Sequence, residues 1–96
     1  MREQQLVDQV LPRLVRMAEH YEFQTIRRVV LQVGVSNTID RQLLVQTFLQ
    51  AFLNTPFAGA AIDIIELRPN DPITGADGKP ARARGTEIIV ARIDGE

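Results

Sequence analysis

The amino-acid sequence predicts an α+β domain in which two helices pack on one face of a three-stranded mixed sheet. Two segments repeat apolar residues at three- and four-residue steps, which is the period of a helix with one buried face. Three other segments are short and rich in β-branched residues, as strands are. Packing both helices on one face of the sheet is the simplest way to bury all five elements. The chain has 96 residues, so we expect a single domain over residues 1–96.

The first predicted helix covers residues 5–23, where the apolar side chains from Leu6 to Tyr21 follow helical spacing. Pro12 lies inside this pattern. Because proline lacks a backbone N–H and its ring clashes with the preceding turn, it costs about 3 kcal/mol or more in a continuous helix. The apolar stripe continues past Pro12, so we expect one kinked helix rather than two elements.

The second predicted helix covers residues 41–53 and is preceded by Asp40. An aspartate in this position caps a helix, because its carboxylate accepts a hydrogen bond from a free N–H of the first turn. The inner stripe of this helix consists of Leu43, Leu44, Thr47, Phe48, Ala51 and Phe52.

Each predicted strand is a short run in which β-branched residues dominate. In the first strand Val29, Leu31 and Val33 share one face, and Gly34 ends the run. The three predicted strands cover residues 26–34, 61–67 and 86–93. The order is therefore helix, strand, helix, strand, long loop, strand.

The long loop covers residues 68–85, where prolines and glycines interrupt every periodic pattern. We expect this segment to be flexible. Lys79, Arg82 and Arg84 form a short basic stretch near its end. This stretch is typical of a solvated loop tip, and the alternative is a docking contact for an acidic surface of a partner.

The composition excludes several classes of function. Eleven basic and twelve acidic side chains leave a net charge of −1, which argues against binding nucleic acid or an anionic membrane. No apolar run approaches the roughly 20 residues that span a bilayer, so we expect a cytoplasmic protein. The chain has no cysteine, which excludes disulfides, thiolate catalysis and cysteine-based zinc sites. No serine or threonine is paired by the sequence with a histidine and a carboxylate, so we expect no enzyme.

Residues 27–67 carry a set of motif residues in a fixed order. They are Val29, Val30, Gly34, Ser36, Phe48, Gly59, Ala60, Ile62 and Ile64. They match a family pattern of a Val-Val-Leu-x-Ile/Val-Gly strand, a Ser-x-x-Asp turn, a helix with a phenylalanine and a Gly-Ala-x-Leu/Ile-x-Ile strand, and the order of elements agrees as well. In these residues the segment resembles the HypA family of nickel metallochaperones, which serve the maturation of hydrogenase and sometimes of urease.

The resemblance implies a nickel site at the N-terminus, with Met1, Glu3 and Asp40 as the retained ligand positions. Arg2 stands where the family has its ligand histidine. A guanidinium stays protonated and cannot bind a metal ion, so we expect weak or no nickel binding. The resemblance also implies that residues 68–85 replace the family's zinc domain. They contain no cysteine, so we expect no zinc.

One hypothesis gives Arg2 a role in this incomplete site. Its fixed positive charge would replace the bound cation and pair with Glu3 or Asp40. The alternative is an Arg2 side chain in solvent, where an ion pair would contribute only about 0–1 kcal/mol.

The resemblance therefore implies an accessory protein of nickel-enzyme maturation that acts by docking. Its expected partner is a maturation GTPase of the HypB type or the large subunit of hydrogenase. The alternative is a metal-free interaction or regulatory module that has diverged from nickel delivery and pairs with copies of itself. The second and third predicted strands are apolar enough to offer an edge for such pairing.

Overall fold

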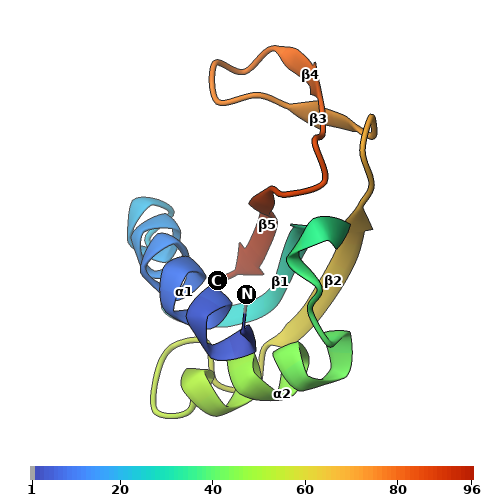
Figure 1. The fold of residues 1–96 in the computed structure, drawn as a ribbon. Coiled ribbons are helices and arrows are strands. Elements are labelled where there is room, and N and C mark those ends of the chain that lie inside the picture. The colour runs from blue at the N-terminus through green and yellow to red at the C-terminus, as the bar shows by residue number, and fades with distance from the viewer. Residues whose placement is uncertain (1) are drawn as a thin grey trace.

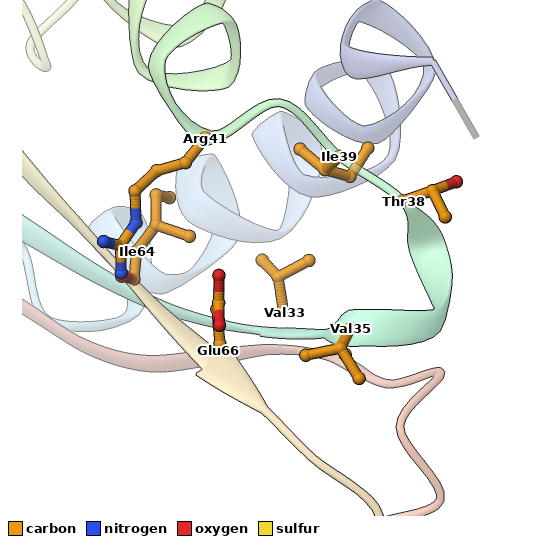
Figure 2. Close-up of a pocket in the computed structure, with 8 residues that line it drawn as sticks. Val33, Val35, Thr38, Ile39, Arg41, Ile64 and Glu66 are labelled. Carbon is orange, nitrogen blue, oxygen red and sulfur yellow. The ribbon is translucent and has the colours of Figure 1, made fainter.

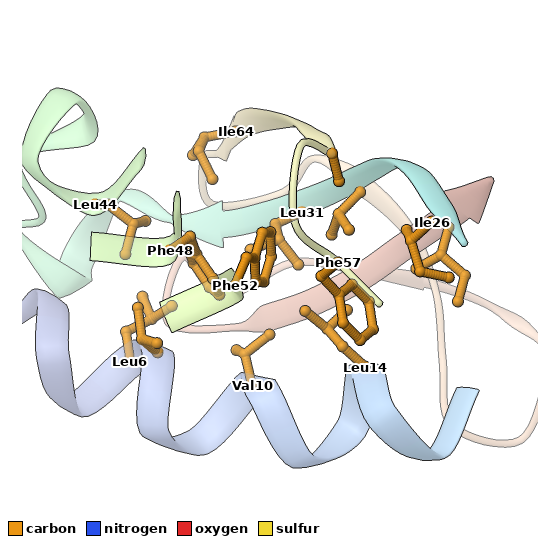
Figure 3. Packing of buried hydrophobic residues seen from close by; sticks show 14 of the residues in the cluster. Leu6, Val10, Leu14, Ile26, Leu31, Leu44, Phe48, Phe52, Phe57 and Ile64 are labelled. Atoms are coloured by element: carbon orange, nitrogen blue, oxygen red, sulfur yellow. The ribbon is translucent and has the colours of Figure 1, made fainter. Parts of the chain in front are cut away.

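Two helices and a three-stranded sheet form the body of the molecule (Figure 1), as the sequence predicts. The structure is a computed structural model that describes residues 2–96. Both helices lie on the same face of the sheet (Figures 1 and 3). In chain order the elements are α1 (Glu3–His20), β1 (Ile26–Gly34), the 3-10 turn η1 (Val35–Asn37), α2 (Arg41–Phe52), β2 (Ala61–Leu67), β3 (Pro72–Thr74), β4 (Pro80–Arg82) and β5 (Ile88–Gly95).

The sheet is mixed, with the strand order β2-β1-β5. β1 pairs in parallel with β2 and antiparallel with β5. The parallel pair requires a crossover connection, which α2 supplies between β1 and β2. In the central strand Val29, Leu31 and Val33 are all buried, so the predicted face is the one that the core covers. The bounds predicted for β1 and β2 are confirmed.

α1 is one unbroken helix with Pro12 on its exposed side. It begins two residues earlier than predicted, because the side chain of Gln5 accepts a hydrogen bond from the N–H of Arg2 at 3.0 Å and closes the first turn. It ends at His20 because Glu22 adopts a left-handed backbone conformation with φ 57°.

The core lies between the helices and the sheet and is centred on three phenylalanines (Figure 3). The ring of Phe52 is stacked 5.2 Å from that of Phe57 and lies 5.7 Å from that of Phe48. Leu6, Val10, Leu14 and other apolar residues of α1 close the core from below, as the view in Figure 3 shows. Each fully buried side chain of this size stabilises the fold by about 1.5–3 kcal/mol.

Residues 68–85 form a hairpin of two short antiparallel strands, β3 and β4, where the sequence analysis expected a loop without regular structure. The hairpin is a separate two-stranded sheet that extends away from the body (Figure 1). At its base the N–H of Ala83 donates to the carbonyl of Asp71 at 2.8 Å, and the N–H of Asn70 donates to the carbonyl of Ala83 at 2.8 Å. The two chain segments therefore leave the body side by side.

β5 begins at Ile88, two residues later than predicted. The carboxylate of Glu87 accepts hydrogen bonds from the N–H groups of Arg84, Gly85 and Thr86, at 2.8 to 3.2 Å. These donors are thereby held in a tight turn in front of the strand. No helix among residues 2–96 is long and apolar enough to cross a bilayer.

Candidate functional site

The structure assigns Asp40 a structural contact at the start of α2. Its Oδ1 accepts a hydrogen bond from the N–H of Leu43 at 3.1 Å, so the predicted helix cap is confirmed. Glu3 is half-buried at the first position of α1. Met1, the third expected ligand position, lies outside the described residues. Residues 2–96 contain no group of three or more histidine, cysteine or acidic side chains that could hold a metal ion, so the nickel site stays a prediction.

Arg2 is exposed and forms no ion pair with Glu3 or Asp40, so the structure agrees with the second hypothesis, an Arg2 side chain in solvent. The ion pairs of the described chain join Arg27 to Glu96, Arg28 to Asp63 and Arg92 to Asp94. What fixes Arg2 is its backbone, since its N–H donates to Gln5 and its carbonyl accepts from the N–H of Leu6. An exposed side chain gains little from an ion pair in water, which agrees with its being unpaired.

A small cavity of about 100 Å³ lies where β1 and β2 end and α2 begins (Figure 2). Its wall is largely apolar and includes Val33, Ile39 and Ile64. The guanidinium of Arg41 donates to the carbonyl of Ile64, and the carboxylate of Glu66 lines the same cavity without forming an ion pair with Arg41. Ligand pockets typically measure about 300–1,000 Å³, so this cavity fits water or a group of few atoms rather than a metabolite.

This cavity was not predicted from the sequence. The signal for it is the meeting of two parallel strand ends with the start of a helix, which is the usual place for ligands in α/β sheets. The pairing of Val33 with Glu66 brings the two strand ends together, and that register is known only from the structure.

The surroundings of Glu87 lower the pKa of its carboxyl group. Its pKa is lowered from 4.5, chiefly because the N–H of Arg84 donates to the charged carboxylate, while desolvation opposes this shift. The hydrogen bonds of its carboxylate all come from N–H groups of the turn before β5. Glu87 thus holds the base of the hairpin, which is a structural task.

Comparison with known proteins shows a likeness to solved structures and none to sequence families. No family model matches the sequence, and no curated protein matches it. The solution structure of the Ni metallochaperone HypA from Helicobacter pylori has a similar fold, with a TM-score of 0.72 and 16% sequence identity. The likeness covers 99% of this chain and 97% of that chain.

At this identity the likeness concerns the fold. It confirms the α+β class and the arrangement that the resemblance in the sequence implied, over nearly the whole of both chains. The similar structure is that of a metallochaperone rather than an enzyme.

Proposed function

We propose that this protein is a HypA-like accessory protein of nickel-enzyme maturation that acts by docking onto another protein. The observation that carries the proposal is the HypA fold, which extends over 99% of the chain. The motifs of residues 27–67 support it, because Gly34, Gly59 and Ala60 stand where the family has them. Fold alone does not determine function, so the partner has to be tested directly.

The experiment is a binding assay with the two expected partners, a purified maturation GTPase of the HypB type and the large subunit of a hydrogenase. The protein should carry no tag at its N-terminus, because we propose that docking uses α1 and the N-terminal edge of the protein. Binding of either partner in the micromolar range or tighter supports the proposal. Failure to bind both contradicts it.

We propose further that nickel is bound weakly or not at all. Arg2 supplies no imidazole, and Oδ1 of Asp40 is already engaged with the N–H of Leu43. Nickel(II) favours several nitrogen ligands, so restoring one should strengthen binding. We expect Arg2→His to raise the affinity for nickel by at least about tenfold in calorimetric titration, a change of about 1.4 kcal/mol.

The control for this prediction is Gln50→His, which adds an imidazole on the exposed side of α2, where no histidine or acidic residue lies three or four positions away. A gain in Gln50→His equal to that in Arg2→His would mean that any added histidine suffices. No gain in Arg2→His would mean that more of the nickel site has been lost than one ligand.

The alternative function is a metal-free interaction module that has left nickel delivery. The engagement of Asp40 as a helix cap favours it, because this carboxylate has an adequate structural task without metal. Light scattering at high protein concentration, with and without nickel, discriminates one version of this alternative. A strict monomer would exclude a module that pairs with itself.

A further inference from the structure

The outer edge of β5 borders a groove that lies between this strand, the β3–β4 hairpin and α1. Two adjoining hollows of about 530 and 440 Å³ make up the groove. Both are lined by Ile73 and Thr74 of β3 and by Ile89 and Val90 of β5. The first extends over the sheet to Gln32 of β1, and the second reaches Arg13 and Met17 of α1. We call this the β5 groove. The β5 groove is large enough for an extended peptide segment, whereas the cavity beside Arg41 is too small for one.

The backbone of β5 offers hydrogen-bonding groups to this groove. The N–H of Gly34 donates to the carbonyl of Glu87 at 2.6 Å, which fixes the alternation of the antiparallel ladder. Ile88 and Val90 therefore turn their backbone groups away from β1, up to the register shift between Val90 and Arg92. In agreement, the carbonyl of Ile88 accepts a hydrogen bond from Nη1 of Arg13 at 3.0 Å. β5 is at the edge of the sheet, so no strand among residues 2–96 pairs with it on this side.

The floor of the β5 groove is apolar. Met17, Ile73, Ile88 and Val90 are each half-buried, so they keep part of their apolar surface in contact with solvent. An added strand presents alternate side chains to one face, and a floor of this kind can bury them. The groove thus complements both the backbone and the side chains of an extended segment.

The hairpin adds positive charge beside the groove. The N–H of Gly75 donates to the carbonyl of Lys79 at 2.7 Å, and Arg82 pairs with Pro72, so both cations belong to residues directly opposite the groove lining. Arg82 donates only to the backbone carbonyl of Asn70, at 3.3 Å. No ion pair of the described chain includes Lys79 or Arg82.

The acidic side chains of the hairpin form no ion pair with these cations in the described chain. Oδ2 of Asp71 accepts from the N–H of Arg68 at 2.8 Å, and Oδ1 of Asp77 accepts from the N–H of Lys79 at 3.0 Å. Both carboxylates are thus used to shape the turns of the hairpin. The basic side chains remain available to a ligand of opposite charge.

We propose that the β5 groove binds an extended acidic segment of a partner protein, which joins the sheet as a fourth strand beside β5. The backbone edge selects an extended chain, the floor selects alternate apolar residues, and the hairpin selects acidic residues between them. This proposal rests on the docking role proposed above, and it is independent of nickel binding.

The test uses a fluorescent ten-residue peptide in which valine or isoleucine alternates with glutamate. Fluorescence polarisation measures its binding to the full chain. We expect saturable binding that weakens as salt is raised, because exposed charge pairs are screened. Two control peptides should bind at least about tenfold more weakly. One replaces glutamate by lysine, and the other carries N-methyl groups on alternate backbone amides, which block strand pairing.

Two variants test the same contacts from the side of the protein. Lys79→Glu combined with Arg82→Glu should lower the affinity for the acidic peptide by about tenfold, because two attractive charges become repulsive. Val90→Pro removes an outward N–H and should weaken it by a similar factor, about tenfold. If Val90→Pro fails to fold, the N-methylated peptide still tests strand pairing. The matched control Arg16→Glu changes charge equally per residue but lies outside the groove, and should leave binding unchanged.

Four outcomes of the binding assays would overturn the proposal. They are absence of binding, equal binding of the N-methylated peptide, equal binding of the lysine peptide, and tighter binding of a single-stranded oligonucleotide of the same charge. Self-association that Val90→Pro abolishes would also overturn it, because the occupant would then be a second copy. If the protein binds the maturation GTPase but not the acidic peptide, only the proposal for the β5 groove is contradicted. Peptide binding without capture of either maturation partner would count against the proposed function alone.

Discussion

Gly34 lies where the end of β1 passes closest to the turn before β5. A Cβ atom at this position would lie 2.2 Å from the carbonyl oxygen of Gly85 and 2.6 Å from the backbone N of Thr86. Backbone atoms on both sides leave no room for it. The glycine that ends the strand motif in the sequence is therefore required by close packing.

We predict that Gly34→Ala lowers the free energy of unfolding by about 2–4 kcal/mol, because the turn before β5 must move away from β1. Chemical denaturation measures this change. Gly75→Ala is the control, since the nearest atom to its added Cβ would be the side-chain Oδ1 of Asp77 at 3.0 Å, which can rotate. Equal losses in both variants would contradict the explanation.

Glu87 links the stability of the same turn to pH. Because its folded-state pKa lies below the ordinary value of 4.5, the charged carboxylate stabilises the fold above that pH, and the contribution is lost as the pH falls through the folded value. We predict that Glu87→Gln lowers the urea midpoint near neutral pH. It should also reduce the fall of the midpoint between roughly pH 5 and pH 3.

The control for this pH dependence is Glu66→Gln, which removes an exposed carboxylate on β2 that forms no ion pair. This variant should keep the steepness of the wild-type fall. If the urea midpoint of Glu87→Gln fell with pH as steeply as that of the wild type, the hydrogen bonds of Glu87 would contribute nothing to stability in acid.

At the scale of the elements, each edge strand of the three-stranded sheet accepts a hydrogen bond from an arginine of a helix. Arg41 of α2 donates to the carbonyl of Ile64 in β2, and Arg13 of α1 donates to the carbonyl of Ile88 in β5. Each helix thus occupies one acceptor on the strand at its side of the sheet. Charged side chains at the edge of a sheet discourage pairing with a foreign strand. Arg13 occupies only one carbonyl of β5, so the rest of that edge stays open.

The hairpin is attached to the body by a narrow neck, so its loss should leave the body folded. The hydrogen bond between Ala83 and Asp71 shows that the two ends of the segment 72–82 lie close together. We predict that replacing residues 72–82 by a two- or three-residue glycine-serine linker changes the free energy of unfolding by no more than about 1 kcal/mol. Circular dichroism and denaturation measure this. A molten or unfolded product would show that the hairpin is part of the core.

The elements also show what the sequence could and could not predict. β1 and β2 were predicted with their observed bounds, because β-branched residues dominate both runs and carry a strong strand signal even in β2 at the edge of the sheet. The hairpin was missed because Pro72 and Pro80 count against strands. They are tolerated here since this two-stranded ribbon has no third strand that would need their missing N–H groups.

For the candidate site, the sequence predicted the local contact of Asp40 but neither the cavity beside Arg41 nor the β5 groove. The cap by Asp40 is local in sequence and was predicted correctly. The two hypotheses for Arg2, pairing or exposure to solvent, depended on the direction of an exposed side chain, which no local pattern determines; the structure shows no ion pair of Arg2 within residues 2–96. The cavity beside Arg41 and the β5 groove depend on strand register and on the position of the hairpin. Both of these come from tertiary structure alone.

At the scale of the whole molecule, one core joins both helices to the sheet, so we expect a single unfolding transition. Phe52 is fully buried between two other phenylalanines. We predict that Phe52→Ala lowers the free energy of unfolding by about 3–5 kcal/mol, a large part of the 5–15 kcal/mol typical of a domain. Phe52→Leu should cost less, because it leaves a smaller cavity. Calorimetry with two separate transitions would contradict the single core.

The pairing of β1 with β5 has a consequence for the order in which the chain is built. β1 sits in the middle of the sheet, yet its antiparallel neighbour is synthesised only after α2, β2 and the hairpin. The β1–α2–β2 unit can form first from neighbouring segments, while the other side of β1 stays without a partner. During that interval the apolar residues of β1 are open to foreign strands. A nascent chain paused before Ile88 is therefore the state in which this protein most needs a chaperone.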